Sequence, residues 1–313
     1  MQTRLLLSVS ALGLALASLP AHGASQLPGA AAASPRPPEC RNRVSVSGSE
    51  LWGRARVPEL ARFCDALARG YARLGRAPSD ALIQADKAER ALPGRAATWV
   101  LRGRAHFALG RFEPAWQAFV SARKLAPRSL DAPGALHDFA RSALRTAHYA
   151  EALTAYRALV PRAALFDSET LQQRVHLEAA AQAMWTGPTG LGEALGYLSE
   201  ARRAAGTPGL EDLVLGALAL TLDRQGRQVE AEGVLREVGS GFDPGALAKS
   251  AHAPELPPGE LLALSAMISG RRDPGRAQAE WSQFVASQPS SPWLAHARAK
   301  LAALSRGRAK GTH

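Results

Sequence analysis

Three prolines recur at a fixed interval along this chain of 313 residues. Pro93, Pro127 and Pro161 lie 34 positions apart (93, 127 and 161), and each follows a run of helix-forming residues. A proline cannot continue a helix, so each one marks the end of a helix. Helix ends that recur at this interval predict a stacked array of helical hairpins, in which each hairpin buries its apolar face against its neighbours.

The clearest copy of the unit covers residues 96–129. Its marker residues are Trp99, Gly103, Gly110, Phe112, Ala115, Phe119, Ala122 and Pro127. The small residues Gly103 and Ala115 allow two helices to approach closely, and Gly110 falls where the backbone must turn between them. At this spacing the unit resembles the tetratricopeptide repeat (TPR). Arg102 departs from the family pattern, which usually has an apolar residue there.

The resemblance implies an all-α fold, a right-handed superhelical solenoid of about six helix-turn-helix hairpins that spans residues 58–304. The expected hairpins cover residues 58–93, 96–127, 132–160, 168–205, 209–238 and 258–288. A last helix that ends at Leu304 is expected to cap the array, followed by a basic tail at 305–313. Residues 239–257 are rich in Gly, Pro and Ala, and they predict a loop with a short helical piece.

The first 23 residues have the form of a secretory signal peptide. Arg4 precedes an apolar stretch that is short for a membrane anchor, and Pro20 and small residues follow it. We expect cleavage after Gly23 or Ala24, and export to the periplasm or the medium. An uncleaved anchor helix is the alternative. No cysteine follows closely enough for a lipoprotein anchor, and no later run predicts a membrane span. Residues 24–57 are expected to form a disordered tether and an irregular lead-in.

Cys40 and Cys64 are the only cysteines. In an oxidising compartment an even number of cysteines favours a disulfide, and this one would close a loop of about 25 residues, worth roughly 3 kcal/mol. Two independent buried thiols are the alternative. Without a C-x-x-C motif or nearby histidines, the pair predicts neither redox catalysis nor a metal site.

The protein carries a formal net charge of +11, which raises the question of nucleic acid as a partner. Its basic residues, however, are spread over every segment, alongside acidic residues at helical spacing. Solvated helix faces explain this distribution, so we do not expect a nucleic-acid-binding protein.

No catalytic, metal-binding or cofactor-binding motif is present: the sequence lacks H-E-x-x-H, G-x-S-x-G and P-loop patterns. An enzyme acting on cell-wall or polysaccharide substrates would need a pair of inward carboxylates. Glu151, Glu178 and Glu211 are candidates by residue type alone, and their helix faces place most of them toward solvent. A small-ligand carrier would need a closed apolar pocket, whereas solenoids more often present an open groove.

In TPR arrays the first helix of each hairpin lines a concave surface. By that resemblance, the surface includes Arg104, Phe107, His137, Arg141, Arg145 and Arg174. Such a basic patch suits carboxylates, as in an acidic peptide or the C-terminus of another protein. The alternative is that arginine is simply the commonest solvated residue of this protein. We therefore expect an exported, non-enzymatic scaffold that binds a protein or peptide. The sequence does not predict its oligomeric state.

Overall fold

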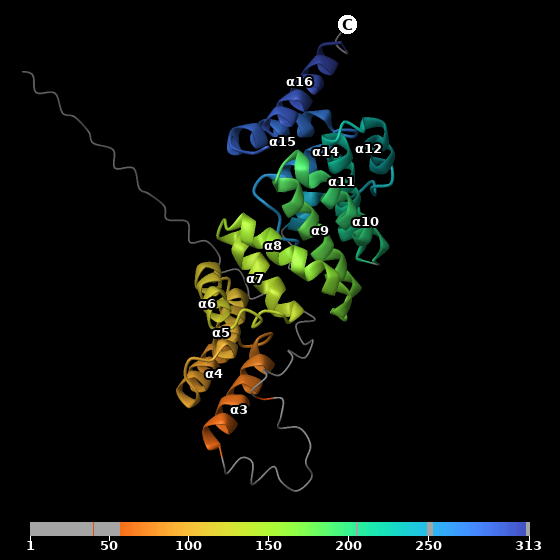
Figure 1. The fold of residues 1–313 in the computed structure, drawn as a ribbon. Coiled ribbons are helices and arrows are strands. Elements are labelled where there is room, and N and C mark those ends of the chain that lie inside the picture. Colours follow the sequence, from red (N-terminus) through yellow and green to blue (C-terminus); the bar gives the residue numbers. More distant parts are fainter. Residues whose placement is uncertain (1–39, 41–56, 205, 249–252, 311–313) are drawn as a thin grey trace, which may run out of the picture.

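The computed structural model describes residues 40, 57–204, 206–248 and 253–310, and within these ranges all regular secondary structure is helical (Figure 1). The predicted signal peptide, residues 1–23, lies outside the described residues. So does the predicted tether and lead-in at 24–57, apart from Cys40 and Val57.

Six pairs of helices follow one another along the sequence. They are α3 (Pro58–Arg73) with α4 (Pro78–Ala91), α5 (Ala96–Ala108) with α6 (Phe112–Leu125), α7 (Pro133–Arg145) with α8 (Tyr149–Leu159), α9 (Glu169–Trp185) with α10 (Leu191–Arg203), α11 (Pro208–Arg224) with α12 (Gln228–Leu235), and α14 (Glu260–Ser269) with α15 (Pro274–Ser287). The helices of each pair pack against each other, and most of their remaining contacts are to the adjoining pairs.

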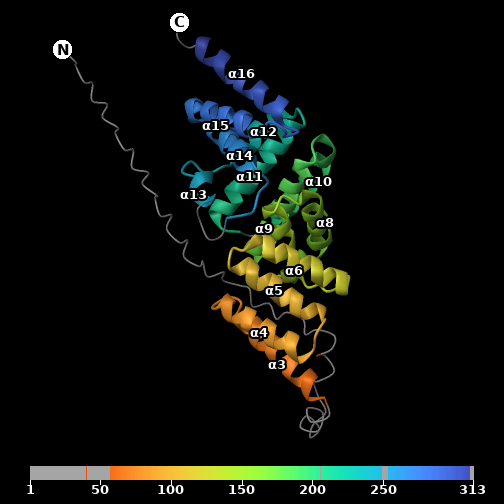
Figure 2. The same ribbon diagram turned by 90° about the vertical axis from the view of Figure 1, so that its left-hand side faces the viewer.

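The pairs stack in sequence order, from α3 at one end of the molecule to α16 (Leu294–Lys310) at the other (Figure 1 and Figure 2). The fifth and sixth pairs are joined by α13 (Pro244–Ala248), and α11 packs directly on α14. This arrangement is an all-α solenoid of TPR-like hairpins with a C-terminal helix, as the sequence predicts.

The three periodic prolines end helices as expected. Helices α4, α6 and α8 end at Ala91, Leu125 and Leu159, each two positions before its proline. After α8 the backbone continues as the 3-10 helix η1 (Val160–Leu165). The last helix differs from the prediction, because α16 continues to Lys310, beyond the expected end at residue 304.

Small residues decide how the hairpins close. A Cβ on Gly103 would lie 2.7 Å from the ring of Phe119, so only glycine lets α5 and α6 pack this closely. Gly110, between these helices, has a φ of 70°, a left-handed conformation that glycine adopts without strain. The corresponding position between α7 and α8 is Ala147, with a φ of 63°. The third hairpin therefore carries backbone strain in a turn that other hairpins make with glycine.

The capping helix α16 is fixed by polar contacts to earlier helices. His296 Nε2 and Lys300 Nζ on α16 lie 2.6 Å and 2.5 Å from the two carboxylate oxygens of Asp223 on α11. Just before α16, Trp293 donates its indole N–H to the backbone oxygen of Met184 at 2.8 Å. These contacts hold the last helix against the open side of the array.

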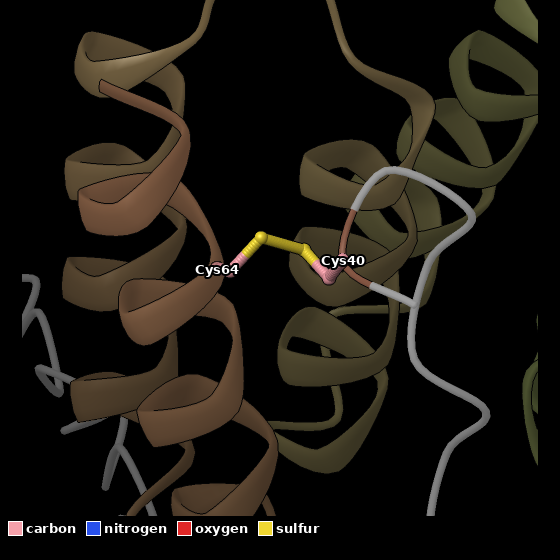
Figure 3. Close-up of a disulfide and its surroundings, with 2 residues drawn as sticks. All are labelled: Cys40 and Cys64. Carbon is pink, nitrogen blue, oxygen red and sulfur yellow. A yellow bond between two sulfur atoms is a disulfide. The ribbon is translucent and has the colours of Figure 1, made fainter. Parts of the chain in front are cut away.

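Cys40 and Cys64 form a disulfide, as the sequence predicts (Figure 3). The bond ties residue 40 to α3, with 5.8 Å between the two Cα atoms. Cys40 is buried with Phe63 and Leu67 in the apolar cluster of the first hairpin. The disulfide therefore links the segment that precedes the solenoid to its first hairpin.

Among the helices of the described ranges, none combines the length and the apolar character needed to cross a bilayer.

Candidate functional site

A single buried carboxylate lies at the centre of a cluster of polar side chains in the solenoid. Glu178, on α9, is fully buried. Its Oε2 atom lies 2.7 Å from His137 Nε2 on α7, and it accepts a hydrogen bond of 3.0 Å from the Tyr156 hydroxyl on α8. Tertiary packing of three helices thus places these side chains together.

Two guanidinium groups complete this arrangement. Arg141 Nε on α7 lies 3.7 Å from Glu178 Oε1, and Arg174 stands one turn before Glu178 on α9. We call Glu178, His137, Tyr156, Arg141 and Arg174 the Glu178 cluster.

The cluster keeps its carboxylate ionised. Burial raises the pKa of Glu178, but His137, Arg141 and Arg174 outweigh burial and lower that pKa from 4.5 to about 2. Burial also lowers the pKa of Arg174 and raises that of Tyr156 well above 10. At neutral pH Glu178 is therefore a fixed negative charge and not a proton donor.

A segment that is distant in sequence lies against the cluster. Residues 253–257 run without regular secondary structure between α13 and α14, and we call them the cover segment. The backbone N–H of Glu255 donates to Glu178 Oε1 at 2.8 Å. The Glu255 carboxylate accepts from Arg141 at 3.1 Å and from Arg145 at 3.4 Å. The cover segment thus places a second carboxylate among the arginines of α7.

Aromatic rings support the same arginines. The Arg141 guanidinium lies 5.0 Å from the centre of the Phe107 ring, and that of Arg145 lies 4.4 Å from the centre of the Phe112 ring. Contacts of this kind hold a guanidinium in one orientation while its N–H groups remain directed at an anion. Phe107 and Phe112 are therefore positioning residues for the arginines that hold Glu255.

The structure brings five of the six sequence-predicted binding residues together at this site, namely Phe107, His137, Arg141, Arg145 and Arg174. Arg104 has another main partner: its Nε donates to Asp138 Oδ2 at 2.8 Å, which joins α5 to α7. The predicted open surface is wrong for most of these residues, because neighbouring helices and the cover segment bury all except Arg145. Whether these residues bind a partner stays a prediction.

The anionic half of the site could not be predicted from the sequence. Helical periodicity places most of the three candidate glutamates toward solvent and does not single out Glu178, whose side chain is fully buried. The signal in the sequence is a single acidic residue within a run of small and apolar residues, LEAAAQAM. Glu255 gives no signal, because it approaches the site from a segment 77 positions away.

Some buried polar atoms of α9 remain without a hydrogen-bond partner. They are Gln173 Oε1, Arg174 Nε, His176 Nδ1 and both side-chain polar atoms of Gln182. Arg174, Glu178 and Gln182 are spaced four residues apart and lie along one face of α9. The α9 face therefore has hydrogen-bonding capacity that the described residues do not use. No group of three or more metal-ligating side chains occurs among the residues that the structure describes.

No protein-family model matches this sequence, and no curated protein matches it. Among solved structures, the protein is similar to a chain in the crystal structure of the APC/C hetero-tetramer Cut9-Hcn1, with 15% sequence identity and a TM-score of 0.34. The match covers 83% of this chain and 57% of that chain, so this protein spans little more than half of its neighbour's length. The TPR-like fold is thus assigned from the helix pairs and their stacking, and the function is argued from the site.

Proposed function

We propose that this protein is an exported, non-enzymatic interaction scaffold whose α7 and α9 face binds an extended acidic segment of a partner protein. The observation that carries the proposal is the way in which the solenoid binds Glu255. Two arginines hold its carboxylate, and a buried glutamate accepts its backbone N–H. A site that holds an extended segment by its carboxylate and its backbone has the chemistry to hold an acidic peptide.

Charge counting supports an anionic partner. Arg141, Arg145 and Arg174 bring three guanidinium groups to the site, whereas Glu178 and Glu255 supply two carboxylates. Guanidinium groups that are partly removed from water interact more strongly with carboxylates than those on an open surface. The site therefore favours carboxylates over neutral or cationic groups.

The proposed export rests on two features of the N-terminal part. Residues 1–23 have the pattern of a signal peptide, and the Cys40–Cys64 disulfide is typical of proteins in oxidising compartments. Expression of the full sequence in a bacterial host tests this point. We expect mass spectrometry of the periplasmic fraction to find the protein shortened at Gly23 or Ala24. A full-length protein that stays in the cytoplasm would contradict export.

A peptide-display selection tests the binding function. Random 12-residue peptides would be selected on the purified protein, and the selected peptides resynthesised with a photo-crosslinker beside their acidic residue. We expect peptides rich in Asp and Glu, crosslinks to α7 and α9, and loss of binding when Asp and Glu become Asn and Gln. Selected peptides without carboxylates, or crosslinks confined to other helices, would refute the proposal.

The structure gives less support to an enzyme acting on polysaccharides. Such an enzyme needs a carboxylic acid that can donate a proton and a second carboxylate that can reach the substrate. Glu178 is ionised at neutral pH and fully buried, and Glu151 and Glu211 lie on the separate helices α8 and α11. Glu178 therefore does not supply the proton donor of such a pair.

A further inference from the structure

The cover segment makes two kinds of contact with the solenoid. On one side, Glu255 reaches Arg141, Arg145 and Glu178 through its carboxylate and its backbone N–H. On the other side, Leu256 packs against the large apolar cluster of the C-terminal half. Neighbouring residues of an extended segment point in opposite directions, so an acidic residue followed by an aliphatic one satisfies both surfaces.

Two prolines restrict the backbone of the cover segment to the extended conformation in which it packs against the helices. Pro254 and Pro257 fix their own backbone φ angles and hold the residues before them in extended conformations. A segment of this kind loses little conformational entropy when it lies against the helices. It therefore resembles an extended peptide ligand that is built into the protein.

The contacts of Glu255 are the part of the site that a carboxylate of a partner can replace. The Glu255 side chain is 19% exposed and that of Arg145 is 48% exposed, whereas Glu178 has no exposed side-chain surface. Water and a competing carboxylate can therefore reach the ion pairs of Glu255, while Glu178 stays in the solenoid. The segment also stays tethered if it leaves, because Arg224 holds Glu260, at the start of α14, in a buried ion pair of 2.8 Å.

A partner can gain contacts that the cover segment does not make. Arg174 Nε and the Gln182 amide lie on the same face of α9 as Glu178 and have no hydrogen-bond partner among the described residues. These groups are buried, so a longer peptide that takes the place of Glu255 gains them only where opening of the site also exposes this face of α9. Unused hydrogen-bonding groups on the same face of α9 as Glu178 would favour a ligand in trans over the tethered one.

Building on the proposed function, we infer that residues 253–257 are an internal ligand that partner binding displaces, and that the partner copies their pattern. The partner segment is extended and carries an acidic residue followed directly by an aliphatic one. While the cover segment is bound, it keeps other anions away from the arginines. Only a partner segment that satisfies both surfaces displaces it.

The test uses the protein's own segment as the probe. A fluorescein-labelled synthetic peptide with the sequence of residues 251–259 (AHAPELPPG) is titrated against the wild-type protein and the variant Glu255→Gln. A short tether gives an internal ligand an effective concentration on the order of millimolar, so we expect the variant to bind the probe about tenfold more tightly. A probe with glutamine in place of its glutamate should bind more weakly to the variant.

Matched controls keep the result interpretable. The variant Glu237→Gln removes a carboxylate whose ion pair with Arg202, at 2.7 Å, is exposed and distant in sequence, and it should bind the probe like the wild type. A second variant, Glu255→Gln with Leu256→Ser, should bind the probe at least as tightly as Glu255→Gln alone. Thermal unfolding and circular dichroism verify that each variant is folded.

Equal affinity of the wild type and Glu255→Gln for the probe, or no binding by the folded variant, would overturn this inference. The display-selected acidic peptides separate that outcome from failure of the proposed function. If they bind the wild type and Glu255→Gln equally well, the scaffold function stands and the internal ligand does not. If no acidic peptide is selected at all, the function itself fails.

Discussion

Replacing the buried carboxylate of Glu178 by an amide should destabilise the solenoid strongly. In the variant Glu178→Gln, Arg141, Arg174 and His137 lose the negative charge at the centre of their cluster, while the shape of the side chain is kept. Removing one partner of a buried ion pair costs about 3–5 kcal/mol, because the remaining charge stays out of water without compensation.

The pKa of Glu178 leads to a similar magnitude. A pKa of about 2 in the folded protein, against 4.5 for an ordinary glutamate, corresponds to roughly 3 kcal/mol at about 1.4 kcal/mol per pH unit. Because the folded pKa lies below the unfolded one, this stabilisation is complete above pH 4.5 and is lost as the pH falls toward 2. The wild type should therefore lose more stability over this interval than Glu178→Gln, which has no carboxyl group to titrate there.

Urea titrations followed by circular dichroism measure both effects, at pH 7 and at several values down to pH 2.5. The control is Glu237→Gln, whose exposed ion pair with Arg202 should be worth at most about 1 kcal/mol. If Glu178→Gln costs no more than this control, or if its stability falls with pH as steeply as that of the wild type, the reasoning about the buried cluster is wrong.

Three further predictions concern the scaffold. Replacing Cys40 and Cys64 together by serine should lower the free energy of unfolding by about 3 kcal/mol, as measured by urea titration without reductant. An unchanged midpoint of the urea unfolding transition would contradict a stabilising disulfide. Gly103→Ala should destabilise the protein by about 1–3 kcal/mol, because its Cβ would lie 2.7 Å from an aromatic ring on α6. The control Gly196→Ala, with open space at its Cβ, should stabilise the protein by roughly 0.5–1 kcal/mol. Thermal melts that show equal effects of the two substitutions would refute the close approach of α5 and α6. Ala147→Gly should stabilise by about 1 kcal/mol, since a φ of 63° strains alanine; a lower midpoint in the same assay would be the contrary result.

The periodic part of the fold could be predicted from the sequence, because each signal acts within one hairpin. A proline ends the helix that precedes it, and a glycine at a turn fixes the local backbone. Pro93 and Pro127 therefore located the ends of α4 and α6, and Gly110 located the turn between α5 and α6.

The candidate site could be predicted only in part, because helical periodicity says which residues share a face and not what covers that face. His137, Arg141 and Arg145 are spaced four residues apart, and they do share one face of α7. Glu255 reaches that face from 110 positions beyond Arg145, through a segment without periodicity. Contacts over such a separation follow from the packing of the whole array, and a single sequence carries no local signal for them.

Hydrogen exchange, read by mass spectrometry with and without a display-selected acidic peptide, tests the central claim most directly. The amides of Ala253, Glu255 and Leu256 report on the cover segment, and those of α9 report on the site beneath it. The account predicts that the bound peptide accelerates exchange in the cover segment and slows it in α9. Slow exchange in the cover segment that persists while the peptide is bound would show that the partner binds elsewhere, and would contradict the account.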